Sequence, residues 1–322
     1  MNMFLLGLVG LMCGLHAATW GAFKDSPFEG FRPASFARSV VLGVLASLLV
    51  GLTTDLESTR SVLVLIGLCY ALERLATEWW KSVVREDDQD AYSIPMRLAL
   101  HGRPIDDRSR RYPLGAAIAA GLVVTCWSAR VLQSTLPPLP VWGVVLIAGA
   151  GGWLTAVGGA WKDAPVEGFS GWKFLRSPAV ATLWALVLYR FTGDWVLLAV
   201  AAAGWSVISI ETYKTFLTGG RPPGKFADKP VRFVADEARE TCRAVHVAVY
   251  GVLALSLGNA VSTSVVDRAA WLSDQMLGLV AVSLMAGAAA VLVVIQPRRG
   301  GRLAVAAGPV TSKAEAALEG ER

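Results

Sequence analysis

Residues 21–31 of the chain read GAFKDSPFEGF, and residues 159–169 read GAWKDAPVEGF. These two stretches lie about 138 residues apart and share the motif Lys-Asp-x-Pro-x-Glu-Gly-Phe. Each follows directly on an apolar block of roughly twenty residues, which is the length of a helix that crosses a bilayer. The pattern predicts a helical membrane protein whose two halves arose by duplication.

Agreement between the halves continues beyond the motif at the same spacing. The matching pairs are Phe36 and Phe174, Arg38 and Arg176, Ser39 and Ser177, Glu73 and Glu211, and Thr77 and Thr215. After a short difference in length, residues 95–99 resemble residues 223–227, and residues 103–105 resemble residues 229–231. Because the halves differ at most apolar positions but share these polar ones, chance does not explain the agreement.

The composition also indicates a membrane protein. Apolar residues make up 54% of the chain and charged residues 17%, whereas soluble domains are roughly a quarter charged. Trp residues gather near the ends of the apolar blocks, as in the aromatic belts of membrane proteins. The chain is therefore expected to be an all-α integral membrane protein with about nine transmembrane helices. The expected helices are 2–22, 36–53, 61–80, 112–132, 141–160, 177–192, 195–213, 240–259 and 273–295.

This helix pattern divides the chain into four parts. We expect a first four-helix repeat at 1–135, a second at 136–260, a ninth transmembrane helix with its basic flank at 261–302, and a disordered cytoplasmic tail at 303–322. Since each repeat holds an even number of helices, both repeats have the same orientation, as in parallel repeats related by an axis along the membrane normal.

Lys and Arg residues gather in alternate loops, at 23–35, 81–111, 161–176 and 214–239, and again after the last apolar block. Loops rich in Lys and Arg stay in the cytoplasm. We therefore expect a multi-pass protein of the inner cell membrane, with its N-terminus outside and its C-terminus in the cytoplasm. Topology also explains the net charge of +5, so membrane lipid, and no nucleic acid, is the expected partner.

The polar residues that the halves share all fall on the cytoplasmic side. Six carboxylates are candidate catalytic residues: Asp25, Glu29, Glu73, Asp163, Glu167 and Glu211. Eight further residues are candidates for substrate binding: Lys24, Arg38, Lys162, Arg176, Tyr213, Lys214, Arg221 and Lys225. Mg²⁺ binds through one or two carboxylates together with phosphate oxygens, and Lys and Arg neutralise phosphate charge. The set therefore indicates a phosphate-bearing substrate, with Mg²⁺ as a candidate cofactor.

The motif itself is expected to form a compact turn between two helices. Its proline lacks a backbone donor and disfavours helix at the residue before it. Gly30 and Gly168 allow a positive φ directly after each glutamate of the motif. Such a turn would place one carboxylate on each side of the proline.

A structural role explains the same motif equally well. Charges near the membrane need partners, so pairs such as Asp25 with Arg38, or Glu29 with Lys24, would pin the loop to the helices. Retention of the motif in both halves favours this interpretation, because when only one copy forms an active site the other copy usually accumulates substitutions.

Three other features also allow a plain interpretation. The acidic run 86–90 would hold a metal or be a solvated loop, and the Gly-rich basic loop 219–225 would cradle phosphate through backbone donors or only set the topology. The three histidines, His16, His101 and His246, are too scattered in the sequence to indicate a metal cluster.

The layout resembles that of the intramembrane prenyltransferases in its helix number and its carboxylates at the cytoplasmic face. The aspartate-rich motifs of that family are absent, as is the signature of the CDP-alcohol phosphotransferases. The sequence is therefore not assigned to any family. The sequence favours a membrane enzyme that acts on a phosphate-bearing lipid or prenyl substrate. A transporter or lipid flippase built from parallel repeats is the first alternative, and a non-catalytic membrane scaffold is the second.

Overall fold

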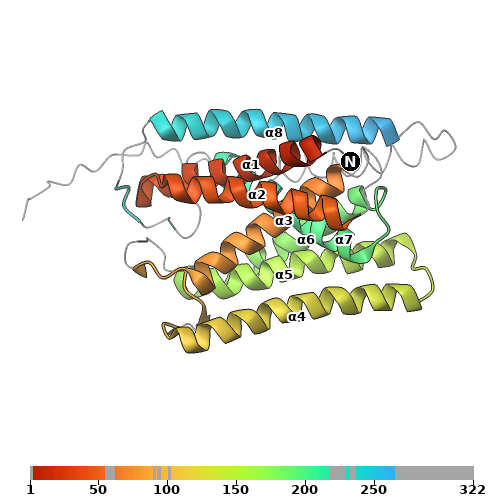
Figure 1. The fold of residues 1–322 in the computed structure, drawn as a ribbon, viewed down its shortest axis with the longest axis horizontal. Coiled ribbons are helices and arrows are strands. Elements are labelled where there is room, and N and C mark those ends of the chain that lie inside the picture. Colours follow the sequence, from red (N-terminus) through yellow and green to blue (C-terminus); the bar gives the residue numbers. More distant parts are fainter. Residues whose placement is uncertain are drawn as a thin grey trace, which may run out of the picture.

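The computed structural model describes residues 3–54, 62–89, 92, 96–100, 103–217, 226, 229–232 and 237–264. Within these ranges the chain is mostly helical (Figure 1), as the sequence predicts. The helices are α1 (Met3–Glu29), α2 (Pro33–Thr53), α3 (Val62–Trp79), α4 (Arg108–Thr135), α5 (Val141–Glu167), α6 (Gly171–Leu188), α7 (Trp195–Thr212) and α8 (Glu237–Ser264). Single π-helical turns follow α3 and α7, namely η2 (Trp80–Val84) and η4 (Tyr213–Leu217). The connection between α3 and α4 holds a two-residue hairpin, β1 (Ala99–Leu100) and β2 (Arg103–Pro104).

Five helices in the described part of the chain are long and apolar enough to cross a membrane: α1, α2, α4, α5 and α7, the last together with η4. The helix α3 differs because it carries Glu73, Arg74 and Glu78 in its last two turns. The expected ninth helix at 273–295 and the tail at 303–322 lie outside the described residues.

The expected compact turn at the motif is wrong. The helix α1 continues through Pro27 to Glu29, and α5 continues through Pro165 to Glu167. A proline within a helix removes one backbone hydrogen bond, but the helical hydrogen bonds resume after the proline in both helices. The amide of Gly30 donates to Ser26 O at 2.9 Å, and the amide of Gly168 donates to the residue four before it at the same distance.

The positive φ expected after each motif glutamate is confirmed. Gly30 has a φ of 75° and Gly168 a φ of 78°, a conformation that residues with a Cβ rarely adopt. Glycine, which has no Cβ, is common directly after the end of a helix. The motif therefore forms the last turn of a long helix and its stop, rather than a separate loop.

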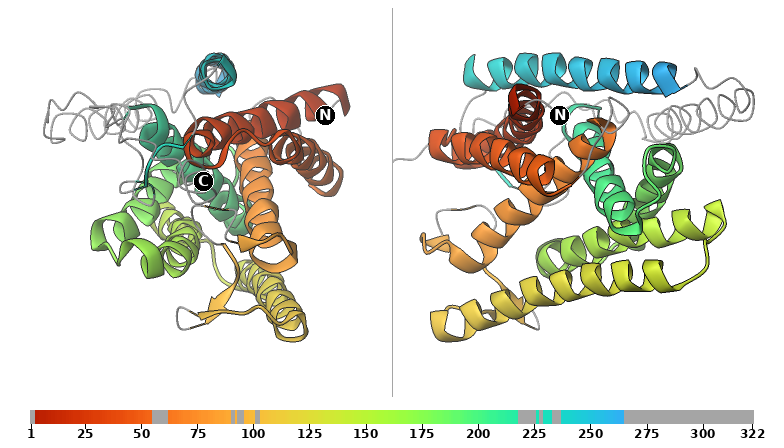
Figure 2. Two further views of the ribbon diagram at one scale, coloured as in Figure 1. Left: turned by 90° about the vertical axis from the view of Figure 1, so that its left-hand side faces the viewer. Right: turned by 45° about the vertical axis from the view of Figure 1, so that its right-hand side comes forward.

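The helices pack as close pairs around α3 and α7 (Figures 1 and 2). At Gly14 of α1 an added Cβ would lie 2.6 Å from Val40 Cα of α2, and at Gly152 of α5 it would lie 2.5 Å from Pro178 Cα of α6. Small residues at such crossings let two helix backbones approach closely, as in membrane helix pairs. The two crossings thus use glycines about 138 residues apart.

The helices α3 and α7 cross at the centre, where the Trp205 indole donates to Leu63 O at 2.9 Å. The helix α8 lies along α1 on one side of the bundle, and α4 lies on the opposite side (Figure 1). Most of α4 is exposed. Near its C-terminal end, Gln133 donates to Gly193 O at 2.9 Å and Arg130 pairs with Asp194 at 3.2 Å.

Candidate functional site

The lysines of both motif copies pair with glutamates on the central helices. Lys24 Nζ lies 3.6 Å from Glu211 Oε2 of α7, and Lys162 Nζ lies 3.1 Å from Glu78 Oε2 of α3. Lys24 is the more buried, with 8% of its side chain exposed against 33% for Lys162. It also lies over the ring of Trp20, with Nζ 4.3 Å from the ring centroid. Each motif therefore reaches a glutamate that lies more than 50 residues away in the chain.

These pairs and the neighbouring ion pairs lie within electrostatic range of one another, and we name the whole set the charged cluster. Its members are Lys24, Asp25, Glu73, Arg74, Glu78, Lys81, Lys162, Asp163, Glu211 and Lys214. Glu78 links Lys162 with Lys81, which it contacts at 3.3 Å. Glu211 links Lys24 with Lys214, which donates to it at 2.8 Å. Lys162 also lies within electrostatic range of Glu211, so both motif copies contribute to the same cluster.

The most deeply buried acid of the charged cluster is Glu73, whose side chain is fully buried. Arg74 Nε lies 2.9 Å from its Oε2, and the Thr77 hydroxyl donates to its Oε1 at 2.9 Å. A buried carboxylate requires such a partner, because removing one member of a buried ion pair leaves an uncompensated charge. Arg74 is thus the partner that the sequence pattern did not identify.

Glu73 Oε2, Arg74 Nε and Glu211 Oε2 are buried without a hydrogen bond but lie in the ion pairs given above. Two aspartates and two arginines among the sequence candidates also keep a buried polar atom with no hydrogen bond to any described residue. These atoms are Asp25 Oδ1, Asp163 Oδ1, Arg38 Nε and Arg176 Nε. Each aspartate oxygen lies 3.9 Å from the neighbouring lysine, which is an ion pair but too long for a hydrogen bond. Buried polar atoms normally have a partner in the protein, a water or a ligand. The four atoms therefore mark where the cluster has capacity to bind something else.

The other sequence candidates fall around the cluster. Arg38 lies within electrostatic range of Glu73 and Glu78, and Arg176 within that of Glu211 and Tyr213. The expected pairing of Asp25 with Arg38 is not found, since Asp25 lies beside Lys24 instead.

Four candidates cannot be placed by side-chain contacts. Glu29 and Glu167 end α1 and α5, and the Glu167 side chain is not among those described. Arg221 and Lys225 lie outside the described residues, together with most of the Gly-rich basic loop.

Among the described residues, no group of three or more His, Cys, Asp or Glu side chains is arranged to hold a metal ion. Mg²⁺ needs only one or two carboxylates when a phosphate supplies further oxygens. Asp25 and Asp163 would be the protein ligands in that case, because each keeps an oxygen without a hydrogen bond in the described part of the chain. The Mg²⁺ cofactor stays a prediction.

Two of the three histidines are not scattered in the fold. His16 of α1 and His246 of α8 lie with ring centroids 4.2 Å apart. Thr212 Oγ1 lies between them, 3.2 Å from His16 Nε2 and 3.4 Å from His246 Nε2. On its other side His16 Nδ1 lies 3.0 Å from the Tyr70 hydroxyl. No spacing in the sequence predicts this contact, because it depends on how α8 packs against α1.

The hydrogen bonds around these histidines form a chain in which each group donates to the next, from Tyr70 to Thr19, when both histidines are neutral. The Thr19 hydroxyl donates to Leu15 O at 2.8 Å, so it accepts from His246 Nδ1 at 3.1 Å. His246 Nε2 must then accept from Thr212. At the other end the Trp20 indole donates to the Tyr70 hydroxyl at 2.7 Å, which leaves the tyrosine proton for His16. Every donor in the chain is used when both histidines are neutral.

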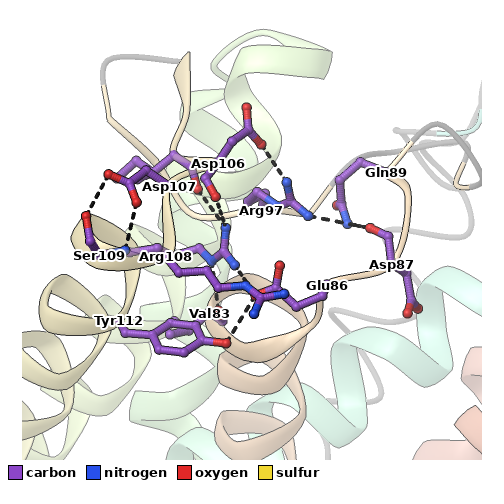
Figure 3. Close-up of polar contacts among 12 residues, drawn as sticks. Val83, Glu86, Asp87, Gln89, Arg97, Asp106, Asp107, Arg108, Ser109 and Tyr112 are labelled. Atoms are coloured by element: carbon purple, nitrogen blue, oxygen red, sulfur yellow. Dashed lines mark hydrogen bonds and ion pairs between the residues drawn. The ribbon is translucent and has the colours of Figure 1, made fainter.

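The acidic run after η2 holds the connection between α3 and α4 (Figure 3). The Arg111 side chain is fully buried and donates to the Glu86 carboxylate, to Val83 O at 2.9 Å and to Ile105 O at 3.0 Å. Arg108 Nε lies 3.0 Å from the same carboxylate. Glu86 is therefore engaged by arginines, so the metal interpretation of this run is not supported there.

The pKa of Glu86 lies below its usual value. Desolvation alone would raise this pKa, but the hydrogen bonds from Arg111, Tyr112 and Arg108 outweigh it. The pKa of Asp107 is also lowered, since its carboxylate accepts from the hydroxyl and amide of Ser109 at 2.7 and 2.9 Å. Both acids thus remain ionised and hold the start of α4.

Comparison of the chain with models of protein families, with curated proteins and with solved structures found no match. A function must therefore be argued from the geometry of the chain itself.

Proposed function

We propose that the protein is a multi-pass protein of the inner cell membrane, built from two homologous four-helix halves in parallel orientation. The membrane assignment draws on the five helices that are long and apolar enough to span. The duplication draws on paired features about 138 residues apart, such as the helix stops at Gly30 and Gly168 and the glycine crossings at Gly14 and Gly152. The loop charges favour an N-terminus outside and a C-terminus in the cytoplasm.

Within this protein, the charged cluster acts on a phosphate-bearing lipid or prenyl substrate at the cytoplasmic face. The observation that carries this proposal is that Asp25, Asp163, Arg38 and Arg176 each keep a buried polar atom without a hydrogen bond to a described residue. Arginines in this position bind phosphate oxygens. The aspartates supply a general base or, with substrate oxygens, the ligands of a magnesium ion.

A reconstituted enzyme assay tests the proposal. The full-length protein is placed in liposomes that contain phosphatidic acid, a prenyl phosphate or a prenyl diphosphate, with Mg²⁺, and new products are sought by phosphorus NMR and mass spectrometry. We expect turnover of one of these lipids, and a loss of about 10²–10⁴-fold in Asp163→Asn, as for removal of a general base. An Asp163→Asn protein that turns the substrate over at the unmodified rate would remove Asp163 from the chemistry.

A transporter or flippase is the second candidate, and the hydrogen-bonded chain around His16 and His246 favours it. Polar side chains within membrane helices often mark the path of an ion or substrate. Fluorescently labelled phosphatidic acid in the inner leaflet of liposomes, quenched from outside, measures flipping directly. Flipping without any chemical product would establish this candidate in place of the enzyme. If neither flipping nor turnover is observed, the non-catalytic scaffold is the remaining candidate.

A further inference from the structure

Two arginines lie against one tyrosine near the start of α2, and a third arginine lies within electrostatic range of one of them. Arg85 Cζ lies 3.8 Å from the centroid of the Tyr92 ring, and Arg32 Cζ lies 4.3 Å from the same centroid. Arg38 lies within electrostatic range of Arg85. We name these four residues, Arg32, Arg38, Arg85 and Tyr92, the arginine site. The sequence analysis singled out only Arg38 among them.

Arg85 is the decisive member of the arginine site. Only 9% of the residue is exposed, and its Nε and Nη2 atoms are buried with no hydrogen bond to any described residue. The Nε atom of Arg38 is also buried with no hydrogen bond to any described residue. A guanidinium group is always charged, and a buried charge without a partner is strongly unfavourable. The buried N–H groups of Arg85 therefore call for an anion beside them, and Arg38 lies within electrostatic range of Arg85.

Three acids near the arginine site are already engaged by other groups. Glu73 is engaged by Arg74 and Thr77. Glu78 is engaged by lysines 81 and 162. The Asp87 carboxylate accepts from the Tyr92 hydroxyl at 2.6 Å. These three carboxylates thus each have another partner in the described residues.

The start of α2 adds to the positive potential. Its first turn has no side-chain cap among the described residues. Pro33 has no amide, and the amides of Ser35 and Phe36 donate to Arg32 O, so the positive end of the helix dipole near Arg32 is the contribution of this helix start. Helix N-termini of this kind bind phosphate groups. The position matched to Arg32 in the second half is Ser170, whose hydroxyl accepts from the Lys173 amide at the start of α6. The start of α6 therefore has a side-chain cap, whereas the start of α2 has none in the described residues.

We infer that the arginine site binds a phosphate group, with Arg38 and Arg85 as its main ligands. Stacking on Tyr92 fixes the guanidinium plane of Arg85 and leaves its N–H edge for bidentate contact with phosphate oxygens. The inference deepens the proposed function, on which it rests for the view that the bound phosphate belongs to a substrate. It assigns that phosphate to the first half of the chain.

Binding can be measured without turnover. The full-length protein in nanodiscs of phosphatidylcholine is titrated with dioctanoyl phosphatidic acid and, separately, with inorganic phosphate. We expect saturable binding of at least one probe, reduced about 10-fold or more in Arg85→Gln and in Arg38→Gln, since hydrogen bonds to charged groups contribute this much. Arg110→Gln is the matched control, because its side chain is 83% exposed, and it should bind like the unmodified protein.

The two probes distinguish the source of the phosphate. Binding of phosphatidic acid alone points to a lipid headgroup, and equal binding of inorganic phosphate points to a soluble anion. Thermal unfolding of each variant checks that it is folded, and Arg85→Lys, which keeps the charge but not the planar fork, should bind with intermediate affinity. Absence of binding by the unmodified protein, or unchanged binding by folded Arg85→Gln, would overturn the inference. Binding without turnover of any lipid would instead leave the site standing and remove the proposed enzyme.

Discussion

The end of α1 and the end of α5 carry the same motif, but the helices that follow them begin differently. Both ends stop at a glycine with positive φ, and both motif lysines reach a glutamate on a central helix. The helix α2 then starts at Arg32 without a side-chain cap in the described residues, whereas α6 starts at the capping Ser170. The two helices thus end in the same way, whereas the helices that follow them begin in different ways.

The largest difference is expected between the matched glutamates Glu73 and Glu211. Glu73→Ala leaves Arg74 buried and unpaired and should destabilise the protein by roughly 3–5 kcal/mol. Glu211→Ala should cost roughly 1–3 kcal/mol, because Glu211 is 14% exposed and its partner Lys214 is 28% exposed. Thermal unfolding in one detergent compares them. Equal losses would mean that the two positions are equivalent after all.

The motif lysines should show a smaller difference in the same direction. Lys24→Met removes a buried partner of Glu211 and a contact with Trp20, and we expect a loss of roughly 1–3 kcal/mol. Lys162→Met removes a pair in which both side chains are about one-third exposed, and such pairs contribute roughly 0–1 kcal/mol. Unfolding midpoints of the two variants, measured side by side, provide the test. A larger loss for Lys162→Met would contradict the assigned burial.

The helix stops, in contrast, should respond alike. Gly30→Ala and Gly168→Ala each force a Cβ into a positive φ, at a cost of roughly 1–3 kcal/mol. The two losses should be similar, and they should add in the double variant to within about 0.5 kcal/mol, the usual error of additivity for distant sites. A loss at only one of the two positions would show that the motif ends only one helix in this way.

The smallest effect concerns pH and the first half alone. Because the pKa of Glu86 is lowered on folding, its contribution to stability is present above the unfolded pKa and is lost as pH falls through the folded pKa. The stability difference between the unmodified protein and Glu86→Gln should therefore shrink as pH falls from about 7 toward 3. Unfolding curves across this range measure it, and a difference that grows on acidification would contradict the assigned partners of Glu86.

The sequence predicts most helices well but not the ends of α1 and α5. Apolar blocks place the helices to within a few residues at many boundaries, since burial in a bilayer demands length and continuity. Local propensity predicted a turn at Pro27, yet α1 continues. The pairing of Lys24 with Glu211 is a tertiary contact that acts on this turn, and propensity alone contains no such information.

The candidate site was predictable only in part. Comparison of the sequence with itself at a spacing of 138 residues identified Lys24, Asp25, Glu211 and their counterparts, because polar residues that recur at one spacing stand out among apolar ones. Arg74 and Arg85 have no such signal, since neither is matched by an arginine at the same spacing. The contact of His16 with His246 likewise follows from the packing of α8 on α1.

A double-mutant cycle on Lys24 and Glu211 tests most directly that both halves build one charged cluster. The unmodified protein, Lys24→Met, Glu211→Gln and the double variant are compared by thermal unfolding under one condition. We expect a coupling energy of about 1 kcal/mol or more, as for residues in one ion-pair network. A coupling energy near zero, with both single variants folded, would show that the two side chains do not interact and would contradict the account.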